Sequence, residues 1–354
     1  MIKWERIKWV IQQIREMKMK SAPFATLGIK LMLGSVTLFS VGGIAFHIFL
    51  PEKFFINEVE FTNGDISIYS LIIGGFFIVV GFLMIIFEMY NYKKARKTAK
   101  LIIQGMKDGY KNFPINILSY EDKNNSRDTI KVGMLESDDN LDKQIDYYNS
   151  EKQIDLFNRF ILNDEVDKLY ICARARIPFL VAYGYCLKGN VNIKYIETKH
   201  NTSDSCFLND VNNNIDIVKN NNIVSSNSGD IGLAISFTSE IQKNHLPSNL
   251  QEHTLFVSSS NGMGRLLISN QDNLREVVNK IVSIIDDLSL RVEGTQRIHL
   301  FLSVQTSFAI ELGRNFQEGM HKNWIIYNFN GTEGEYTWAL KLEKEKISRY
   351  IFCN

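Results

Sequence analysis

The sequence predicts an N-terminal transmembrane helical hairpin followed by an α/β domain of two Rossmann-like halves. Three observations carry this prediction. Two long apolar runs with basic flanks lie within the first 100 residues, short β-rich runs alternate with helical stretches after about residue 101, and one strand–turn–helix–strand pattern occurs twice. Alternating strands and helices are typical of α/β folds, and apolar runs of about 20 residues are long enough to cross a membrane.

The two apolar runs, Leu31–Leu50 and Ile66–Phe87, contain a single ionisable residue, His47. With a rise of about 1.5 Å per residue, each run can cross a hydrocarbon core of roughly 30 Å. Lysines and arginines lie before the first run and after the second, whereas the connecting loop Pro51–Asp65 has four acidic residues and one lysine. The positive-inside rule therefore predicts a multi-pass protein with both termini in the cytoplasm.

The remaining chain is divided by composition. Residues 1–22 place tryptophans and isoleucines at helical spacing among basic residues, which predicts an amphipathic helix in the membrane interface. Residues 23–100 form the predicted membrane region, and residues 101–354 form the cytoplasmic domain. The segment 201–230 is rich in Asn, Ser and Asp and separates the predicted halves, about 101–225 and 226–354.

Within the cytoplasmic domain, apolar runs of five to eight residues predict strands, and longer amphipathic stretches predict helices. The expected strands are Ile115–Ser119, Lys168–Cys172, Val191–Ile196, Ile231–Phe237, Thr254–Ser258, Arg297–Ser303, Trp324–Phe329 and Tyr336–Leu342. The expected helices are Glu151–Ile161, Phe179–Leu187, Asn270–Leu290 and Phe308–Phe316.

An internal repeat supports two halves. The segment KLYICARARIPFLVAYGY from Lys168 aligns with RIHLFLSVQTSFAIELGR from Arg297. Both segments predict a buried strand, a polar turn and a helix with a central glycine, Gly184 in the first and Gly313 in the second. Repeated units of this kind predict two Rossmann-like subdomains side by side.

Polar side chains follow the central strand of each repeat. Ligands of such folds bind beyond the carboxyl ends of parallel strands, where helix N-termini attract phosphate. Arginines suit phosphate, and Ser, Thr and Gln can hydrogen-bond phosphate or base edges, although turns after strands are commonly polar for structural reasons alone. The candidate residues are Arg174 and Arg176 in the first repeat and Ser303, Gln305, Thr306 and Ser307 in the second.

Several function classes are disfavoured. The net charge of +1 argues against binding to a DNA or RNA polymer. The four cysteines and six histidines form no CxxC or HExxH motif, so neither a metal site nor a catalytic metal is expected. The chain lacks GxGxxG and GxSxG, which predicts no dinucleotide cofactor and gives no catalytic residue to propose. We therefore expect a protein that is not an enzyme.

The C-terminal part resembles a known family. The run IHLFLSVQTSFAIELGRNFQEGMHKNWIIYNFNG, followed by EYTWALKL, is similar to the closing segment of SAVED domains. The earlier KLYICARARIPFLVAYGY is similar to the first repeat of the same family. The positions that match the closing segment are Leu312, Gly313, Arg314, Tyr327, Asn328 and Tyr336.

The resemblance implies a fold of two fused CARF-like subdomains that sense cyclic oligonucleotides, commonly cyclic trinucleotides, in bacterial anti-phage signalling. With two membrane spans, the chain looks like a membrane effector of CBASS defence in the bacterial inner membrane. Such an effector would bind its ligand, form a homo-oligomer and disrupt the lipid bilayer in abortive infection. Among the matching positions, Tyr327, Asn328 and Tyr336 would contact bases, and Arg314 would contact phosphate or form a structural ion pair.

Two alternatives stay open. A membrane-anchored ring nuclease could degrade the messenger with polar residues alone, since CARF-like pockets need no further motif for it. A non-enzymatic membrane scaffold could instead use the α/β domain to bind a partner protein. Fold alone does not decide among these functions.

Overall fold

The computed structural model divides the chain into two compact units, Met1–Ala95 and Arg96–Asn354, which are taken in turn. The described residues are 23–39, 47–49, 58–60, 68–95, 98–106, 109–133, 140–150, 166–188, 192–198, 205–209, 214–220, 226, 228–343 and 346–351.

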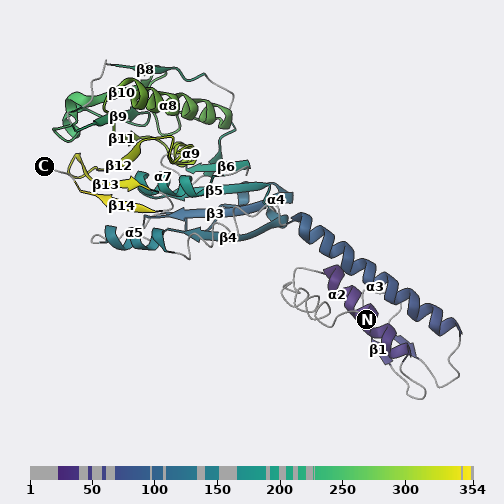
Figure 1. Cartoon of the computed structure of the whole chain (residues 1–354). Coiled ribbons are helices and arrows are strands. Elements are labelled where there is room, and N and C mark those ends of the chain that lie inside the picture. Colours follow the sequence, from purple (N-terminus) through teal and green to yellow (C-terminus); the bar gives the residue numbers. More distant parts are fainter. Residues whose placement is uncertain are drawn as a thin grey trace. The chain divides into compact units, whose positions relative to one another are not determined.

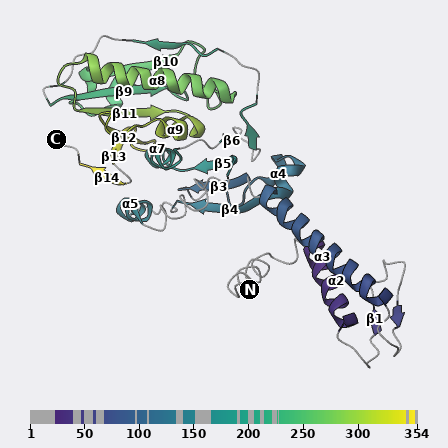
Figure 2. The same cartoon turned by 45° about the vertical axis from the view of Figure 1, so that its right-hand side comes forward.

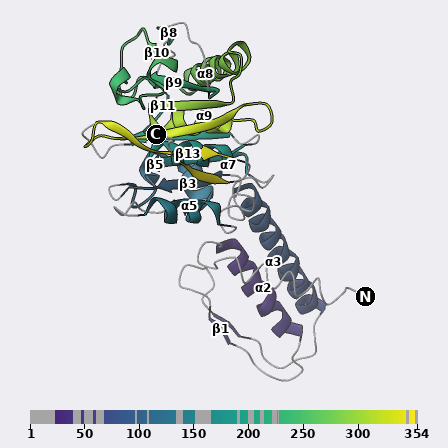
Figure 3. The same cartoon turned by 60° about the vertical axis from the view of Figure 1, so that its left-hand side comes forward.

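The first unit contains two antiparallel helices, α2 (Pro23–Phe39) and α3 (Ile68–Ala95), which run side by side in Figure 3. They approach most closely at two glycines. A Cβ added to Gly28 would lie 2.5 Å from the carbonyl oxygen of Gly81, and a Cβ added to Gly81 would lie 2.6 Å from that of Gly28. Only glycine allows backbones to approach this closely. Two short strands, β1 (His47–Phe49) and β2 (Glu58–Glu60), pair antiparallel.

The predicted membrane region differs from this arrangement in part. Among the described residues, no helix combines the length and the apolar character needed to cross a membrane. Within the run predicted as a helix over Leu31–Leu50, the residues up to Phe39 are helical, but His47–Phe49 form β1, so the helix prediction is wrong for these three residues; residues 40–46 and Leu50 lie outside the described residues. The following Leu50-Pro51 step explains an extended end, because the residue before proline disfavours helical backbone. The predicted interfacial helix over residues 1–22 lies outside the described residues.

The second unit begins with a five-stranded sheet of order β4-β3-β5-β6-β7. Its first four members are parallel, and β7 is antiparallel at the edge. We call the segment from β3 to β7 the first half. Its elements are β3 (Thr98–Gln104), the 3-10 helix η2 (Ile115–Ile117), α4 (Tyr120–Asn125), β4 (Ser126–Val132), α5 (Leu141–Asn149), β5 (Lys168–Arg174), α7 (Ile177–Cys186), β6 (Asn192–Thr198) and β7 (Ser205–Phe207).

The second half is a seven-stranded sheet of order β14-β13-β12-β11-β9-β10-β8, in which β12, β11, β9 and β10 are parallel. Its strands are β8 (Ile217–Lys219), β9 (Asp230–Ser236), β10 (Thr254–Ser259), β11 (Arg297–Ser303), β12 (Asn323–Asn330), β13 (Glu335–Leu342) and β14 (Ile347–Tyr350). Its helices are η3 (Lys243–His245), η4 (Gln251–His253), α8 (Gln271–Arg291) and α9 (Thr306–Arg314).

The two sheets share one core. Buried side chains of both sheets, of α7 and α9, and of α5 and α8 form a single hydrophobic cluster. The helices α7 and α9 lie between the sheets in Figure 1, and α8 runs along the second sheet in Figure 2. Smaller clusters cover the opposite faces, one under the loop before η2 and one under η3 and η4. The unit is therefore built in three layers, sheet, helices and sheet.

The helices α7 and α9 cross at the two glycines of the internal repeat. A Cβ on Gly184 would lie 2.1 Å from the carbonyl oxygen of Ile310, and a Cβ on Gly313 would lie 1.9 Å from that of Val181. Ile310 and Val181 each precede a repeat glycine by three positions, so the contact is reciprocal. The aligned glycines therefore mark the place where the two halves meet.

Most of the predicted elements are confirmed, and β11 has the predicted bounds. The predicted strand Ile115–Ser119 is wrong: residues 115–117 form η2, directly after Pro114, whose fixed φ suits the start of a helical turn. The predicted helix Glu151–Ile161 lies outside the described residues. Five strands of the second unit were not predicted, namely β3, β4, β7, β8 and β14, and β8 joins the second sheet although it precedes the predicted boundary near residue 225.

Candidate functional site

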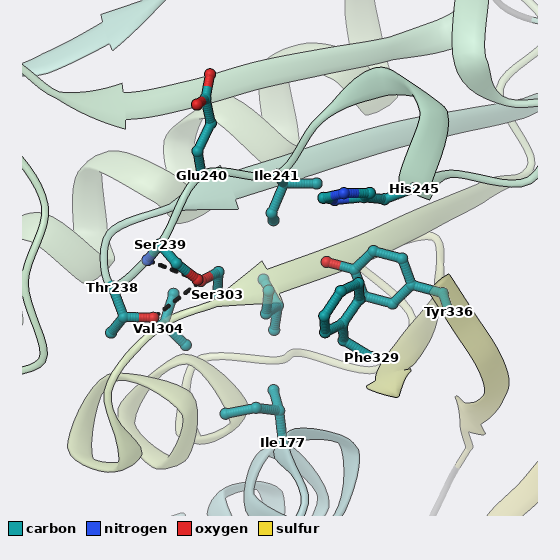
Figure 4. Close-up of a pocket in the computed structure, with 11 residues that line it drawn as sticks. Ile177, Thr238, Ser239, Glu240, Ile241, His245, Ser303, Val304, Phe329 and Tyr336 are labelled. Carbon is teal, nitrogen blue, oxygen red and sulfur yellow. Dashed lines mark hydrogen bonds between the residues drawn. The ribbon is translucent and has the colours of Figure 1, made fainter. Parts of the chain in front are cut away.

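A cavity of about 230 Å³ opens at the carboxyl ends of β9 and β11. Its walls come from the loop after β9, from η3, from the end of β11 and from the β12–β13 pair, while Ile177 at the start of α7 contributes from the first half (Figure 4). The cavity thus lies at the strand edge where parallel sheets bind ligands. Of the predicted site residues, Ser303 and Tyr336 line it.

Ser303 is the centre of a hydroxyl cluster. Its Oγ lies 2.8 Å from Oγ1 of Thr238 and 2.7 Å from Oγ of Ser239, and it accepts a 3.0 Å hydrogen bond from the Ser239 N–H. The backbone N–H groups of Phe237 and Thr238 donate to the Ser303 carbonyl oxygen at 2.9 and 2.8 Å. These bonds tie the loop after β9 to the end of β11 and present rotatable hydroxyls to the cavity.

Three rings form the opposite side of the cavity, and we call His245, Phe329 and Tyr336 the aromatic wall (Figure 4). The ring centroids of His245 and Phe329 are 5.4 Å apart, and those of Phe329 and Tyr336 are 5.2 Å apart. Tyr336 is buried, and burial raises the pKa of its hydroxyl, so the ring stays neutral. Phe329 is 37% exposed and leaves apolar surface available to a ligand.

The N-terminus of α9 was a predicted phosphate site, but protein groups already occupy it. The Ser307 N–H donates a 2.7 Å hydrogen bond to Oε1 of Glu197, which reaches across from β6. Burial raises the pKa of Glu197, although hydrogen bonds from Ser307 and Gln305 oppose that shift. Gln305 is the residue before the first turn of α9, and its side-chain amide is used elsewhere: its oxygen accepts from the Ile268 N–H at 3.1 Å, and its nitrogen donates to the Ile268 carbonyl oxygen at 2.9 Å. The expectation of free N–H groups at this helix is therefore wrong for Ser307.

The predicted residues of the first half lie at a different strand edge. Arg174 ends β5 and is exposed, and Arg176 precedes α7 and is half-buried. The gap beside Arg176, between the ends of β3 and β5, holds about 10 Å³, which is room for one water molecule at most. Both arginines lie within three positions of Ile177, which lines the main cavity. Their role in binding stays a prediction.

The other predicted residues do not line the cavity. Arg314 ends α9 and donates to Glu311 at 2.9 Å and to the Leu187 carbonyl oxygen at 3.1 Å, which favours the structural ion pair over phosphate binding. Tyr327 is buried in β12, Asn328 is buried beside it, and Thr306 is half-buried at the start of α9. A ligand role for these four residues stays a prediction that the cavity does not support.

The sequence analysis missed a polar network at the amino ends of β9 and β11. His299 Nε2 lies 3.0 Å from Oδ1 of Asp230, and its Nδ1 lies 2.8 Å from the Tyr327 hydroxyl. Nη2 of Arg297 donates to Asp230 at 2.9 Å. Burial opposes ionisation of Asp230, but hydrogen bonds from His299, Arg297 and Ser228 together hold its pKa well below its ordinary value. The sequence held one signal of this network, namely His299 within the otherwise apolar predicted strand Arg297–Ser303.

Thr238, Ser239, His245 and Phe329 were also missed as cavity residues. The signal for Thr238 and Ser239 was present, because these two hydroxyl residues directly follow the predicted strand Ile231–Phe237, and the aligned strand of the repeat, β11, ends in a serine. His245 lies in a loop and carried no such signal. Among the described residues, no group of three or more His, Cys, Asp and Glu side chains is arranged to hold a metal ion.

Comparison with known proteins gives one family. The family model of the SMODS-associated and fused to various effectors sensor domain, SAVED, matches residues 153–342, which is more than half of the chain. No curated protein matches the chain.

The chain is also similar to solved structures of proteins described as SAVED/CARF-domain containing receptors. Two are of the Acinetobacter baumannii Cap4 SAVED/CARF-domain containing receptor, one with the cyclic trinucleotide 2'3'3'-cAAA and one with 3'3'3'-cAAA. Both are 14% identical to this chain, with TM-scores of 0.49 and 0.48, and cover 76% and 77% of it. The Moraxella osloensis Cap4 receptor is 16% identical, with a TM-score of 0.44 and 76% coverage. The chain spans 57–60% of the length of these three structures.

Proposed function

The chain belongs to the SAVED family of sensor domains, and on that premise we propose that its second unit is a receptor for a cyclic oligonucleotide, with a cyclic trinucleotide as the expected ligand. The observation that carries the proposal is the cavity at the carboxyl ends of β9 and β11. It combines hydroxyl groups on one side with aromatic surface on the other, which are the groups that recognise nucleotides outside a duplex.

The size of the cavity indicates which part of the ligand it takes. Pockets that enclose a whole small-molecule ligand measure roughly 300–1,000 Å³, whereas this cavity measures about 230 Å³. We therefore assign it to one base and its sugar. The rest of the ring would extend past Ile177 to the strand edge of the first half, where Arg174 and Arg176 would contact phosphates in bidentate geometry.

For the first unit we propose the output of the signal, namely anchorage in the bacterial inner membrane and its disruption. The sequence supports this proposal through two apolar runs whose basic flanks favour an orientation with both termini in the cytoplasm. The side chains of α3 add support, because Phe76, Val79 and Leu83 are 63%, 57% and 58% exposed. Contiguous exposed apolar surface of this kind marks contact with a membrane or a partner.

Two helices cannot enclose a pore, so the proposed mechanism requires assembly. Ligand binding would drive the formation of a homo-oligomer, and clustered first units would then make the bilayer permeable. In this scheme the protein binds the messenger without converting it, and it acts as a ligand-gated effector and not as an enzyme.

The test uses the full chain in phosphatidylethanolamine–phosphatidylglycerol vesicles loaded with dye, with cyclic triadenylate as the probe. We expect saturable binding by calorimetry, ligand-dependent dye release and intact ligand on recovery. Ser303→Ala and Phe329→Ala should each weaken binding about tenfold, because hydroxyl contacts and base stacking contribute on the order of 1–3 kcal/mol. Tyr120→Ala is the matched control, since Tyr120 is 85% exposed and lies outside the cavity.

Each other outcome assigns a different function. Absence of binding across cyclic di- and trinucleotides would overturn the receptor proposal. Binding without dye release would overturn the membrane output and leave a sensor with another effector. Catalytic conversion of the probe to linear product would favour the ring nuclease.

A further inference from the structure

The imidazole of His245 is held in one orientation and one tautomer by its own 3-10 helix. The Gln242 N–H donates a 3.2 Å hydrogen bond to Nδ1 of His245, and the His245 N–H donates a 3.0 Å bond to the Gln242 carbonyl oxygen. A ring nitrogen that accepts a hydrogen bond carries no proton, so the neutral ring carries its proton on Nε2. Nε2 is therefore a hydrogen-bond donor.

That donor has no protein acceptor in the described part of the chain. The other contact of the ring is with Phe329, at a centroid distance of 5.4 Å and an interplanar angle of 49°. His245 is half-buried and lines the cavity, so its free N–H borders the space that a ligand would fill. A donor in such a position adds affinity when a ligand acceptor reaches it.

Phe329 lies beside an irregularity in the pairing of its strand β12 with β13, where β13 has one additional residue, Thr337. The pairing of β12 with β13 shifts register between Asn328 and Phe329, and Phe329 then faces Tyr336 across the pair. Bulges of this kind redirect a side chain and are common beside binding sites. Tyr336 is fixed from behind by Phe301, whose ring centroid lies 4.9 Å away. Within the aromatic wall, Tyr336 is therefore buried and held by packing, whereas Phe329 and His245 remain partly exposed.

We propose that the aromatic wall is a purine subsite in which the base stacks on Phe329 and Nε2–H of His245 donates to one ring nitrogen of the base. Adenine and guanine present ring nitrogens that accept hydrogen bonds without a proton of their own, and stacking on an aromatic ring tolerates either base. This inference rests on the proposed function and names the base that the cavity takes. His245 is then the residue that distinguishes purines from bases lacking an acceptor at that position.

The test measures binding of cyclic triadenylate and of its 1-deaza, 3-deaza and 7-deaza analogues to the full chain by calorimetry. His245→Phe keeps a ring against Phe329 and removes the donor. We expect this variant to bind cyclic triadenylate about tenfold more weakly. One deaza analogue should bind the unsubstituted protein about tenfold more weakly than cyclic triadenylate does. The His245→Phe variant should bind that analogue and cyclic triadenylate with equal affinity. Coupling of the two changes identifies the donor and the acceptor as partners.

The control is His253→Phe, because His253 also ends a 3-10 helix, η4, and does not line the cavity. It should bind all four probes as the unsubstituted protein does. Equal affinity of His245→Phe and the unsubstituted protein would overturn the subsite, as would a variant that still discriminates among the deaza analogues. Absence of binding by the unsubstituted protein is a different result, which overturns the receptor proposal itself.

Discussion

In the first half, β5 ends at Arg174 and α7 follows Arg176; at the aligned positions of the second half, β11 ends at Ser303 and α9 follows Gln305. One strand edge therefore presents guanidinium groups and the other presents hydroxyl and amide groups. The spaces beside them differ as well, at about 10 Å³ in the first half and about 230 Å³ in the second. The halves share a backbone plan and differ in the chemistry at its carboxyl edge.

The amino-terminal ends of the strands, in contrast, have the same construction in both halves. Lys168 and Arg297 occupy the same position of the repeat, at the start of β5 and of β11, and each contacts an aspartate. That aspartate is Asp122 from α4 in the first half and Asp230 from β9 in the second. A third shared feature is the glycine crossing of α7 and α9. The positions that make structural contacts therefore match between the halves, whereas the positions proposed to bind a ligand do not.

The helix crossing offers the largest expected effect. Gly313→Ala places a Cβ 1.9 Å from the Val181 carbonyl oxygen, a distance at which backbone must move. Because packed helices cannot separate locally, we expect the free energy of unfolding to fall by about 3 kcal/mol or more. The measurement is urea unfolding of the full chain in detergent, followed by tryptophan fluorescence.

Two companions sharpen this prediction. Gly184→Ala should cost a similar amount, since its Cβ would lie 2.1 Å from the Ile310 carbonyl oxygen. Gly264→Ala should change stability by less than about 0.5 kcal/mol, because a Cβ there meets nothing within 4 Å. A tolerated alanine at either helix glycine would show that the two halves do not meet as described.

The two aspartates should differ in their contribution to stability. Asp230→Asn should lower the free energy of unfolding at pH 7 by about 3 kcal/mol, because Asp230 bonds both to Arg297 and to the fully buried His299. Asp122→Asn should cost only about 1 kcal/mol, since its ion pair with the 35% exposed Lys168 is screened by water and is not joined by a buried histidine. Equal losses at the two sites would contradict this ranking.

The pH dependence of Asp230 follows from the sign of its shift. Its folded-state pKa is lowered, so the stabilisation is present above the unfolded value of about 3.9 and is lost as the pH falls below it. The difference in unfolding free energy between the unsubstituted protein and Asp230→Asn should therefore narrow by about 1 kcal/mol as the pH falls from 7 to 3. Unfolding free energies at several pH values measure it. A constant difference would show that folding does not lower the pKa of Asp230.

Sequence patterns predicted the elements whose signals are local. The strand Arg297–Ser303 is a run of apolar residues between polar ends, and its bounds were correct. The start of the strand Thr98–Gln104 falls in the predicted membrane region, where Lys100 belongs to the basic flank of the second apolar run; in the fold, that lysine is buried. Local composition could not distinguish these two environments.

The candidate site depended on longer-range arrangement. Ser303 and Tyr336 were predicted and do line the cavity, but His245 reaches it from a loop and Ile177 reaches it from the other half. The capping of α9 by Glu197 joins residues 110 positions apart, across two sheets. No periodicity or motif encodes such a contact, since it arises only when the helix layer brings the halves together.

Glu197 gives the smallest expected effect and the sharpest difference between the halves, because α7 has Arg176 at its start where α9 receives a carboxylate. Burial raises the folded-state pKa of Glu197, so its ionised form costs stability at neutral pH. That cost is relieved as the pH falls from the folded-state value toward the unfolded value of about 4.3. The Glu197→Gln variant cannot titrate, so over the same range it should lack this increase in unfolding free energy, which we expect to be about 1 kcal/mol.

The measurement is the unfolding free energy of the variant and of the unsubstituted protein between pH 7 and pH 4.5. Glu240→Gln is the matched control, because Glu240 is an exposed glutamate at the cavity rim. If Glu197→Gln follows the pH dependence of the unsubstituted protein, folding does not raise the pKa of the Glu197 carboxyl, and burial at the α9 terminus does not oppose its ionisation.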